Sequence, residues 1–198
     1  ENNQKPSKIV SNSSGNHAQA VAWAASRFNI PATIYMSKTV SKVKAQATRA
    51  YGAQVVLCES RAMADQCAID EAKKDGVYWI SSFNHPQVLA GQGTAAYEAF
   101  EDVAQMGIEN IDALFAPCGG GGILSGSLIS ARALSPNTQV IGAEPLNANA
   151  GAQSLRSGKV CYLKSSPSTM ADGAMPMSIC DLTLEYLKQL DGLYEIDE

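Results

Sequence analysis

Short apolar runs alternate along the chain with longer segments in which apolar residues recur at the spacing of an α-helix. In the segment from Ala18 to Phe28, for example, the apolar residues Val21, Ala22, Ala25 and Phe28 fall on one helical face. Strand-like runs that alternate with such helices are typical of parallel sheets that carry helices on their faces. The pattern therefore predicts the α/β fold class, with two open sheets of parallel type flanked by helices.

The predicted elements follow one another in two series. The expected strands cover residues 8–12, 32–36, 54–58, 77–80, 112–116, 139–144 and 193–196. The expected helices cover residues 18–28, 40–51, 62–74, 94–106, 123–134, 148–157 and 181–190. A break near residues 81–86 separates a predicted small α/β domain, residues 1–82, from part of a larger domain, residues 83–198. Because the chain opens without Met and ends on a strand, we expect it to be truncated at both ends.

Composition and charge exclude several classes of partner. The net charge is −4 and no Lys/Arg cluster is present, so we expect no nucleic acid partner. No apolar run is long enough to cross a membrane, and the polar N-terminus lacks the apolar core of a signal peptide. The five cysteines form no C-x-x-C motif, which favours reduced thiols in a cytoplasmic protein. The two histidines, His17 and His85, have no zinc-ligand spacing to cysteine pairs.

The clearest chemical signal is the segment Ala116–Gly126, which stands between a predicted strand and a predicted helix. It contains four consecutive glycines, Gly119 to Gly122, which we call the tetraglycine loop. Glycines let the backbone turn its N–H groups inward, and the following helix adds free N–H groups and the positive end of its dipole. This combination suits a phosphate. A turn with positive φ is the alternative, but such a turn does not require four glycines.

Two common phosphate-binding motifs do not match this loop. A P-loop requires Lys-Ser/Thr after its last glycine, whereas Gly126 is followed by Ser-Leu. A dinucleotide fingerprint requires a third glycine where this chain has Leu124 or Ser125, although Glu144 stands where a ribose-binding acid is expected. The loop therefore favours a monophosphate on a compact cofactor.

A second polar segment, Asn12–His17, also stands between a predicted strand and a predicted helix. Its residues Ser13 to His17 read Ser-Ser-Gly-Asn-His, and we call them the serine loop. Hydroxyls, an amide and N–H groups at a helix N-terminus suit a carboxylate. A simple N-cap is the alternative, although a cap needs only one such residue. No G-x-S-x-G motif of a hydrolase is present.

Two further segments that contain glycine are less specific. Ala90–Thr94 reads either as a functional loop or as the entry to a helix capped by Thr94. Thr169–Gly173 reads as a loop that brings backbone close to a ligand.

Taken together, these segments resemble the pyridoxal phosphate (PLP) enzymes of fold type II, the tryptophan synthase β-like fold, in the serine/threonine dehydratase and serine racemase family. The resemblance extends through nearly the whole chain, and the serine and tetraglycine loops are specific in combination. The matching segments, in order, are residues 13–17, 50–53, 90–94, 117–126, 142–145 and 171–173. The resemblance implies that residues 83–198 are part of the large PLP-binding domain.

The resemblance also implies a set of cofactor-binding residues. Asn16 would bond the phenolic oxygen of the pyridine ring, Phe83 would pack beside that ring, and Gly173 would contact it through its backbone. The PLP phosphate would be held by the run Gly119, Gly120, Gly121, Gly122 and the N–H group of Ile123.

The serine loop is implied to bind the substrate. Ser13, Ser14, Asn16 and His17 would hold the substrate carboxylate. Ser14 matches the serine that, in racemases of this group, exchanges a proton with Cα and is therefore the candidate catalytic residue.

Some features of the family are missing from this sequence. The lysine that forms the Schiff base stands in a Phe/Tyr-Lys-x-Arg-Gly motif upstream of the serine loop, and no lysine here is in that motif. The partner of the pyridine nitrogen is also expected beyond the C-terminal end. Some relatives bind Mg²⁺ or another divalent cation, and Glu144 and the Ala148 carbonyl match two of its ligands. Ala150 replaces the third, an aspartate, which argues against this metal site unless Asn149 or water compensates.

The resemblance implies a PLP-dependent ammonia-lyase that converts L-serine or L-threonine to a 2-oxo acid and ammonia by β-elimination. Serine racemisation, or dehydration or racemisation of 3-hydroxyaspartate, stays open as an alternative at the same site. A different class is a non-catalytic fragment or module that binds PLP or phosphate noncovalently. The expected partner is a small hydroxy amino acid. The intact protein is expected to be a homodimer, and this chain alone is expected to be inactive.

Overall fold

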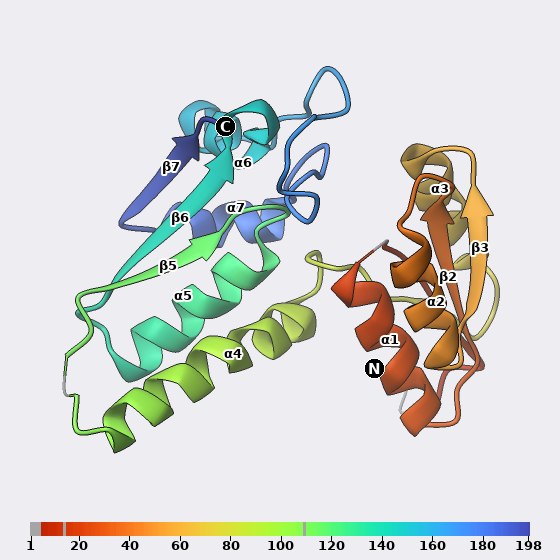
Figure 1. Ribbon diagram of the computed structural model, residues 1–198, viewed down its shortest axis with the longest axis horizontal. Helices are drawn as coiled ribbons and strands as arrows, with labels where there is room; N and C mark the ends of the chain where they lie inside the picture. The colour runs from red at the N-terminus through yellow and green to blue at the C-terminus, as the bar shows by residue number, and fades with distance from the viewer. Residues whose placement is uncertain (1–4, 14, 109) are drawn as a thin grey trace. The chain divides into compact units, whose positions relative to one another are not determined.

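Figure 1 shows the computed structural model of the protein, which describes residues 5–13, 15–108 and 110–198. The chain forms two compact units, Glu1–Ser82 and Phe83–Glu198. Each unit contains one parallel sheet with helices packed against it, which is the predicted α/β class. Within the described residues, no helix is both long and apolar enough to cross a membrane.

The first unit is built on a four-stranded parallel sheet in the order β3-β2-β1-β4. Its strands are β1 (Lys8–Asn12), β2 (Ala32–Ser37), β3 (Gln54–Cys58) and β4 (Val77–Trp79). Its helices are α1 (Asn16–Arg27), α2 (Lys42–Ala50) and α3 (Arg61–Glu71). In Figure 1, α1 and α2 lie in front of the sheet and α3 lies behind it. The buried face of α1 packs on Ile9, Ile34 and Met36 of the sheet.

The order of these strands places β1 at a special position. The chain passes from β1 through β2 to β3 in one direction and then returns to add β4 on the other side of β1. In open α/β sheets, ligands bind at the carboxyl ends of strands where the order reverses in this way. The serine loop leaves the sheet at the carboxyl end of β1, which is this switch point.

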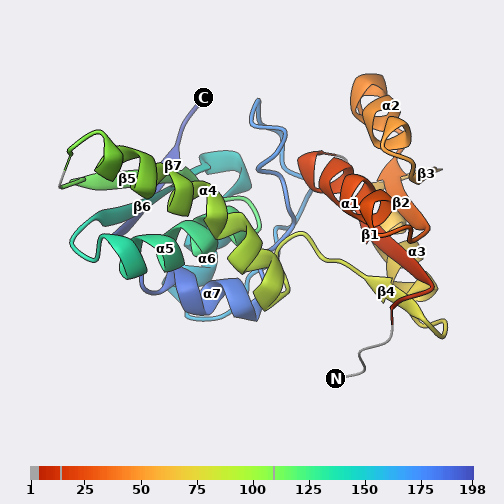
Figure 2. The same ribbon diagram turned by 90° about the horizontal axis from the view of Figure 1, so that it is seen from below.

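The second unit contains a three-stranded parallel sheet in the order β5-β6-β7. Its strands are β5 (Ala113–Pro117), β6 (Gln139–Pro145) and β7 (Gly192–Ile196). Its helices are α4 (Pro86–Gln105), α5 (Gly122–Leu134), the 3₁₀ helix η1 (Leu146–Ala148), α6 (Ala150–Ser157) and α7 (Asp181–Leu187). Helices α4 and α5 lie side by side in both views (Figures 1 and 2).

Helix α4 begins eight residues before the predicted start at Thr94, at Pro86. The His85 side chain caps it by accepting the N–H of Gln87 at 3.2 Å, and Pro86 suits the first turn because a proline lacks the N–H that would be unpaired there. The segment Ala90–Thr94 therefore lies inside the helix. The interpretation of this segment as a capped entry is wrong, because the Thr94 hydroxyl donates to the Gly91 carbonyl at 2.8 Å within the helix.

The glycines of this segment are explained by the contact between the two long helices. A Cβ atom on Gly93 would lie 2.7 Å from the Gly126 carbonyl oxygen of α5, and one on Gly126 would lie 2.5 Å from the Gly93 nitrogen. Ser130 completes the contact by donating to the Gly93 carbonyl at 2.7 Å. Two glycines facing each other thus allow the backbones of α4 and α5 to touch.

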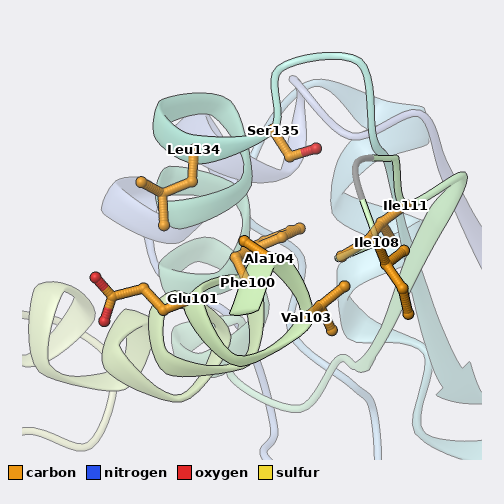
Figure 3. Close-up of a pocket in the computed structure, with 8 residues that line it drawn as sticks. All are labelled: Phe100, Glu101, Val103, Ala104, Ile108, Ile111, Leu134 and Ser135. Carbon is orange, nitrogen blue, oxygen red and sulfur yellow. The ribbon is translucent and has the colours of Figure 1, made fainter. Parts of the chain in front are cut away.

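An apolar pocket lies where the carboxyl ends of α4 and α5 meet the segment that leads to β5 (Figure 3). Phe100 and Ala104 line it from α4, Ile108 and Ile111 from the connecting segment, and Leu134 from the end of α5. Helix α5 has 13 residues and is therefore about 20 Å long. The pocket is at the opposite end of this helix from the tetraglycine loop.

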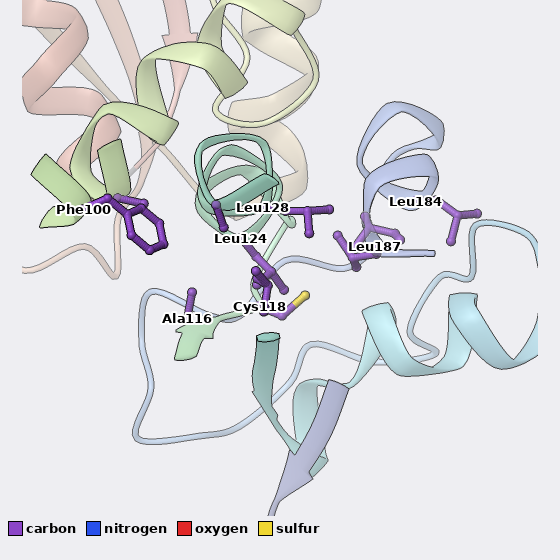
Figure 4. Close-up of a cluster of buried hydrophobic side chains, with 11 residues drawn as sticks. Phe100, Ala116, Cys118, Leu124, Leu128, Leu184 and Leu187 are labelled. Carbon is purple, nitrogen blue, oxygen red and sulfur yellow. The ribbon is translucent and has the colours of Figure 1, made fainter. Parts of the chain in front are cut away.

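The core of the second unit lies between α5, the sheet and α7 (Figure 4). Leu124 and Leu128 of α5 are almost completely buried, as is Leu187 of α7. The cluster around them contains Phe100, Ala116, Cys118, Val140, Ile179 and Leu184. Because both α5 and the strand before it belong to this core, the loop between them is held at both ends.

Candidate functional site

The tetraglycine loop connects the carboxyl end of β5 to α5. Gly121 stands at the N-cap with φ of +86°, in the left-handed region that favours glycine. Ser125 is the first residue whose N–H bonds back along the helix, to the Gly121 carbonyl at 2.9 Å. The N–H groups of the first turn, Gly122 to Leu124, have no acceptor within the helix. The loop therefore presents N–H groups and the positive end of the α5 dipole.

The surroundings of the loop leave little room for side chains on Gly119, Gly120 and Gly121. A Cβ atom on Gly120 would lie 2.2 Å from the ring of Phe83, so this ring covers the loop directly. A Cβ atom on Gly119 would lie 3.2 Å from the Gly173 carbonyl oxygen. Three groups of predicted residues, Phe83, Gly119 to Gly122 and Gly173, are thus neighbours in the second unit.

The loop is supported by two residues that the sequence analysis missed, Thr183 of α7 and the N-cap residue of that helix, Cys180. A Cβ atom on Gly121 would lie 2.9 Å from the Cβ of Thr183, which is fully buried. The Thr183 hydroxyl accepts the Cys180 N–H at 3.2 Å and donates to the Cys180 carbonyl at 3.1 Å. The Cys180 thiol in turn donates to the Phe83 carbonyl at 3.7 Å. No local signal marks these residues, because they lie far from the loop in sequence.

These features fit a small phosphate. The glycines place backbone rather than side chains at the helix end, and Ile123, in the first turn, is partly exposed. An anion at this end gains N–H donors and the helix dipole without any cationic side chain. The loop can therefore hold the phosphate of a compact cofactor such as PLP.

The serine loop is anchored on both sides to the end of β4. The Ser11 hydroxyl donates to the Ile80 carbonyl at 2.7 Å, and Nε2 of His17 lies 3.2 Å from the same oxygen. Because a carbonyl only accepts, Nε2 of His17 carries the proton. Burial lowers the pKa of His17, so the ring is neutral and its other nitrogen is an acceptor. Only the backbone N–H of His17 can therefore donate to a carboxylate.

The remaining residues of this loop are placed as follows. The Ser13 hydroxyl accepts the Gly15 N–H at 3.4 Å, and Asn16 is exposed as the first residue of α1. Gly15 stands at the N-cap, where it has no side chain to bond, so the N-cap interpretation does not account for the polar residues. Ser14 lies outside the described residues.

Glu144, the first of the predicted metal ligands, binds backbone instead. It is 2% exposed, and its carboxylate accepts the N–H groups of Ala152 at 2.6 Å and Gly151 at 3.2 Å, at the amino end of α6. Burial raises the pKa of Glu144 to about 7, and these two N–H bonds oppose the rise. Cys118 directly precedes the tetraglycine loop. Burial raises the pKa of the Cys118 thiol, and the nearby Glu144 carboxylate raises it further.

The other positions of the predicted metal site do not complete it. Ala148 is buried in η1, and Ala150 offers no side-chain ligand. The Asn149 amide is occupied by Glu195 and Gln153, so it does not replace the missing aspartate. Among the described residues, no three His, Cys, Asp or Glu side chains gather to hold a metal. These residues do not fit a divalent cation site of the expected design.

The buried hydroxyl of Ser125 allows the packing of the first turns of α5 to be tested by a change in stability. The Ser125 hydroxyl is fully buried and has no hydrogen-bond partner among the described residues. Ser125→Ala should therefore raise the free energy of unfolding by about 1 kcal/mol, because it removes an unsatisfied group and improves helix propensity. Ser130→Ala is the matched control on the same helix. It removes the bond to the Gly93 carbonyl and should lower the free energy of unfolding by a similar amount. Urea unfolding followed by circular dichroism measures both, and a loss of stability in Ser125→Ala would contradict the packing described.

Known proteins resemble this chain along its whole length. Residues 1–198 match the family model described as "Pyridoxal-phosphate dependent enzyme". The chain is 41% identical over 191 residues to L-threo-3-hydroxyaspartate ammonia-lyase of Saccharomyces cerevisiae, covering 94% of this chain and 56% of that protein. It is 40% identical over 187 residues to serine racemase of Schizosaccharomyces pombe, with the same coverage of 94% and 56%. The chain thus spans little more than half the length of these relatives.

The solved structures agree with the sequence relatives. The crystal structure of the T.th. threonine deaminase superposes with a TM-score of 0.90 and 36% identity, covering 98% of this chain and 63% of that one. The predicted family, α/β fold class and PLP cofactor are thereby confirmed. The chain belongs to the pyridoxal-phosphate dependent enzymes, in the fold type II group of serine/threonine dehydratases and serine racemases.

Proposed function

We propose that the protein containing this chain is a PLP-dependent ammonia-lyase that converts L-serine or L-threonine to the corresponding 2-oxo acid and ammonia. The observation that carries the proposal is the glycine-only entry to α5, with Gly121 in the left-handed conformation and Thr183 packed beneath it. The names of the relatives, which include ammonia-lyases and serine racemases, support the same reaction class.

The residues of the second unit are proposed to hold the cofactor. The backbone of Gly119 to Gly122 and the N–H group of Ile123 bind the phosphate, because the glycines carry no side chains of their own between the N–H donors and an anion. Phe83 and Gly173 border this loop and are proposed to contact the cofactor ring. Asn16 of the first unit is proposed to bond the phenolic oxygen. Bound PLP supplies an electron sink for negative charge that develops at the substrate Cα.

The serine loop is proposed to bind the substrate carboxylate through the hydroxyl groups of Ser13 and Ser14 and the N–H groups of Asn16 and His17. The ring of His17 supports this role because its bond to the Ile80 carbonyl holds the carboxyl-terminal end of the loop in place. Ser14 is proposed to exchange a proton with the substrate Cα. Racemisation of serine is the second candidate function, and the relative named serine racemase, at 40% identity, favours it.

The proposed reaction is tested in the intact protein. Formation of 2-oxo acid and ammonia should be measured with L-serine, L-threonine and L-threo-3-hydroxyaspartate as substrates. L-Alanine, which has no β-hydroxyl group to lose, is the control. Release of a 2-oxo acid from none of the three hydroxy amino acids would overturn the lyase proposal. Conversion of L-serine to D-serine without 2-oxo acid would favour the racemase instead.

Ser14→Ala separates the two outcomes. Because Ser14 is proposed to deliver a proton to Cα, its loss should slow racemisation by about 100-fold and elimination of the L-substrate much less. Chiral chromatography of serine and a coupled 2-oxo acid assay on the same samples measure the two rates. Equal loss of both would contradict the role of Ser14 as an acid/base.

The non-catalytic alternative has a separate test on the 198-residue chain. PLP is added, followed by borohydride, and the lysines are then mapped by mass spectrometry. Noncovalent binding leaves PLP removable by dialysis after this treatment. A stable reduced adduct at one specific lysine would argue against a module that binds PLP only noncovalently.

A further inference from the structure

The residue that precedes the serine loop, Asn12, is held by two hydrogen bonds from distant parts of the first unit. Its amide oxygen accepts the indole N–H of Trp79 at 2.7 Å, and its amide nitrogen donates to Asp65 Oδ1 at 2.7 Å. An indole only donates and a carboxylate only accepts, so the orientation of the amide is fixed by its partners. All three side chains are partly buried.

The three residues join three elements at the point where the chain leaves the sheet. Asn12 is the last residue of β1, Trp79 is the last residue of β4, and Asp65 lies in α3. The serine loop begins with the next residue, Ser13. The side-chain amide of Asn12 fixes the backbone of this residue relative to β4 and α3. The position of the first peptide group of the serine loop therefore depends on Asn12.

On the opposite face of β1, a second hydrogen bond joins this strand to Ile80, the residue after β4. Side chains alternate across a strand, so Ser11 points away from Asn12, and its hydroxyl bonds the Ile80 carbonyl. His17, at the far end of the loop, bonds the same carbonyl. Residues 11, 12 and 17 are thus all tied to Trp79 or Ile80, on both sides of the segment that carries the N–H groups.

We propose that Asn12, held between Trp79 and Asp65, is a positioning residue that fixes the serine loop for binding of the substrate carboxylate. The inference rests on the proposed function and adds residues that the family match does not name. A loop whose donors already point at a common site binds an anion more tightly than one that must first be ordered, because less conformational entropy is lost on binding. Loss of either hydrogen bond of Asn12 therefore lowers carboxylate affinity.

Trp79 provides a signal that reports on this arrangement. The chain has two tryptophans, and the other, Trp23, lies in α1 and is 54% exposed. The nitrogen-edited NMR spectrum of the 198-residue chain therefore has two indole signals, and a Trp23→Phe variant assigns them. Titration with L-serine should shift the Trp79 indole signal, because its acceptor adjoins the occupied loop. L-Serinamide, which lacks the carboxylate, should leave the signal in place.

Two variants compare the loss of the Asn12 hydrogen bonds with their restoration. Asn12→Ala removes both bonds and should weaken L-serine binding by about 10-fold, the size expected for one or two hydrogen bonds. The exchange Asn12→Asp with Asp65→Asn keeps one amide and one carboxylate but reverses the direction of the bond. The indole still finds an acceptor, so L-serine affinity should return to within about 3-fold of the unchanged chain.

A matched control distinguishes positioning from general stability. Thr33→Val removes the bond from the Thr33 hydroxyl to Gln54 between β2 and β3, in the same unit. It should lower stability and leave L-serine affinity unchanged. If Asn12→Ala fails to fold, Asp65→Ala takes its place, since it removes only the acceptor of the Asn12 amide.

The outcomes separate the inference from the function on which it rests. Asn12→Ala, or Asp65→Ala in its place, with unchanged L-serine affinity would overturn the positioning role and leave the proposed function standing. A double exchange that folds but does not regain affinity would also overturn it. If the unchanged chain binds L-serine no better than L-serinamide, the assignment of the serine loop to the carboxylate fails, and the inference fails with it.

Discussion

Gly121→Asp should reduce PLP affinity by at least about 100-fold. Gly121 holds φ of +86° at the N-cap of α5, and Thr183 lies against it. An Asp carboxylate there would accept the free N–H groups and place a negative charge beside the phosphate. Two unit charges about 4 Å apart repel by about 4 kcal/mol at an effective dielectric constant of about 20. This repulsion exceeds the loss of about 3 kcal/mol in binding free energy that corresponds to a 100-fold lower affinity. Equilibrium dialysis with PLP, followed by its absorbance, measures the change.

Two control variants separate charge from backbone strain. Gly121→Ala adds a Cβ atom in the left-handed conformation and against Thr183, but no charge, so it should weaken PLP binding much less than Asp does. Gly158→Asp introduces the same residue at another left-handed glycine, with φ of +73°, at the end of α6. It should lose stability by about 1 kcal/mol and keep PLP affinity. Unchanged PLP affinity in Gly121→Asp would contradict the assignment of the tetraglycine loop to the phosphate.

Gly93→Ala should destabilise the second unit by about 3 kcal/mol, although alanine is the better helix former. The added Cβ atom would lie 2.7 Å from the Gly126 carbonyl oxygen and 3.1 Å from the Ser130 hydroxyl. Because the nearest atom is backbone of α5, relief requires the two helices to separate. Separation weakens the Ser130 bond to Gly93 and the contacts of Phe100 with the core.

The same helix contains the control for this substitution. Gly91 lies two positions earlier in α4 and is exposed, with no atom within 4 Å of a Cβ built on it. Gly91→Ala should therefore raise the free energy of unfolding by about 0.5–1 kcal/mol, as expected for an unhindered glycine in a helix. Chemical unfolding followed by circular dichroism compares the two variants. Similar stabilities of Gly93→Ala and Gly91→Ala would show that the helices do not require the close contact.

The sequence predicts the structure best where a structural preference is local. Alternation of strand and helix patterns predicted two parallel sheets, and each predicted strand is present within one or two residues of its expected bounds. The polar loops were found because glycines, hydroxyls and amides stand directly between a strand and a helix. The sequence mispredicts the start of α4, because the glycines of Ala90–Thr94 are typical of a loop. A packing contact with α5 compensates for the low helix propensity of these glycines. The spacing of apolar residues along the sequence does not indicate such a contact.

The sequence by itself determined the fold class, the family and the two loops of the candidate site, because backbone preferences and short motifs act within a few residues of one another. Only the tertiary structure decided what holds those loops in place. Asn12 finds its partners 53 and 67 positions away, in Asp65 and Trp79, and Cys180 reaches Phe83 across 97 positions. Such pairs depend on how the sheets and helices pack, and each partner is an ordinary residue in its own segment. The structure also assigned Glu144 to the amino end of α6, where backbone N–H groups occupy the carboxylate that the resemblance offered to a metal.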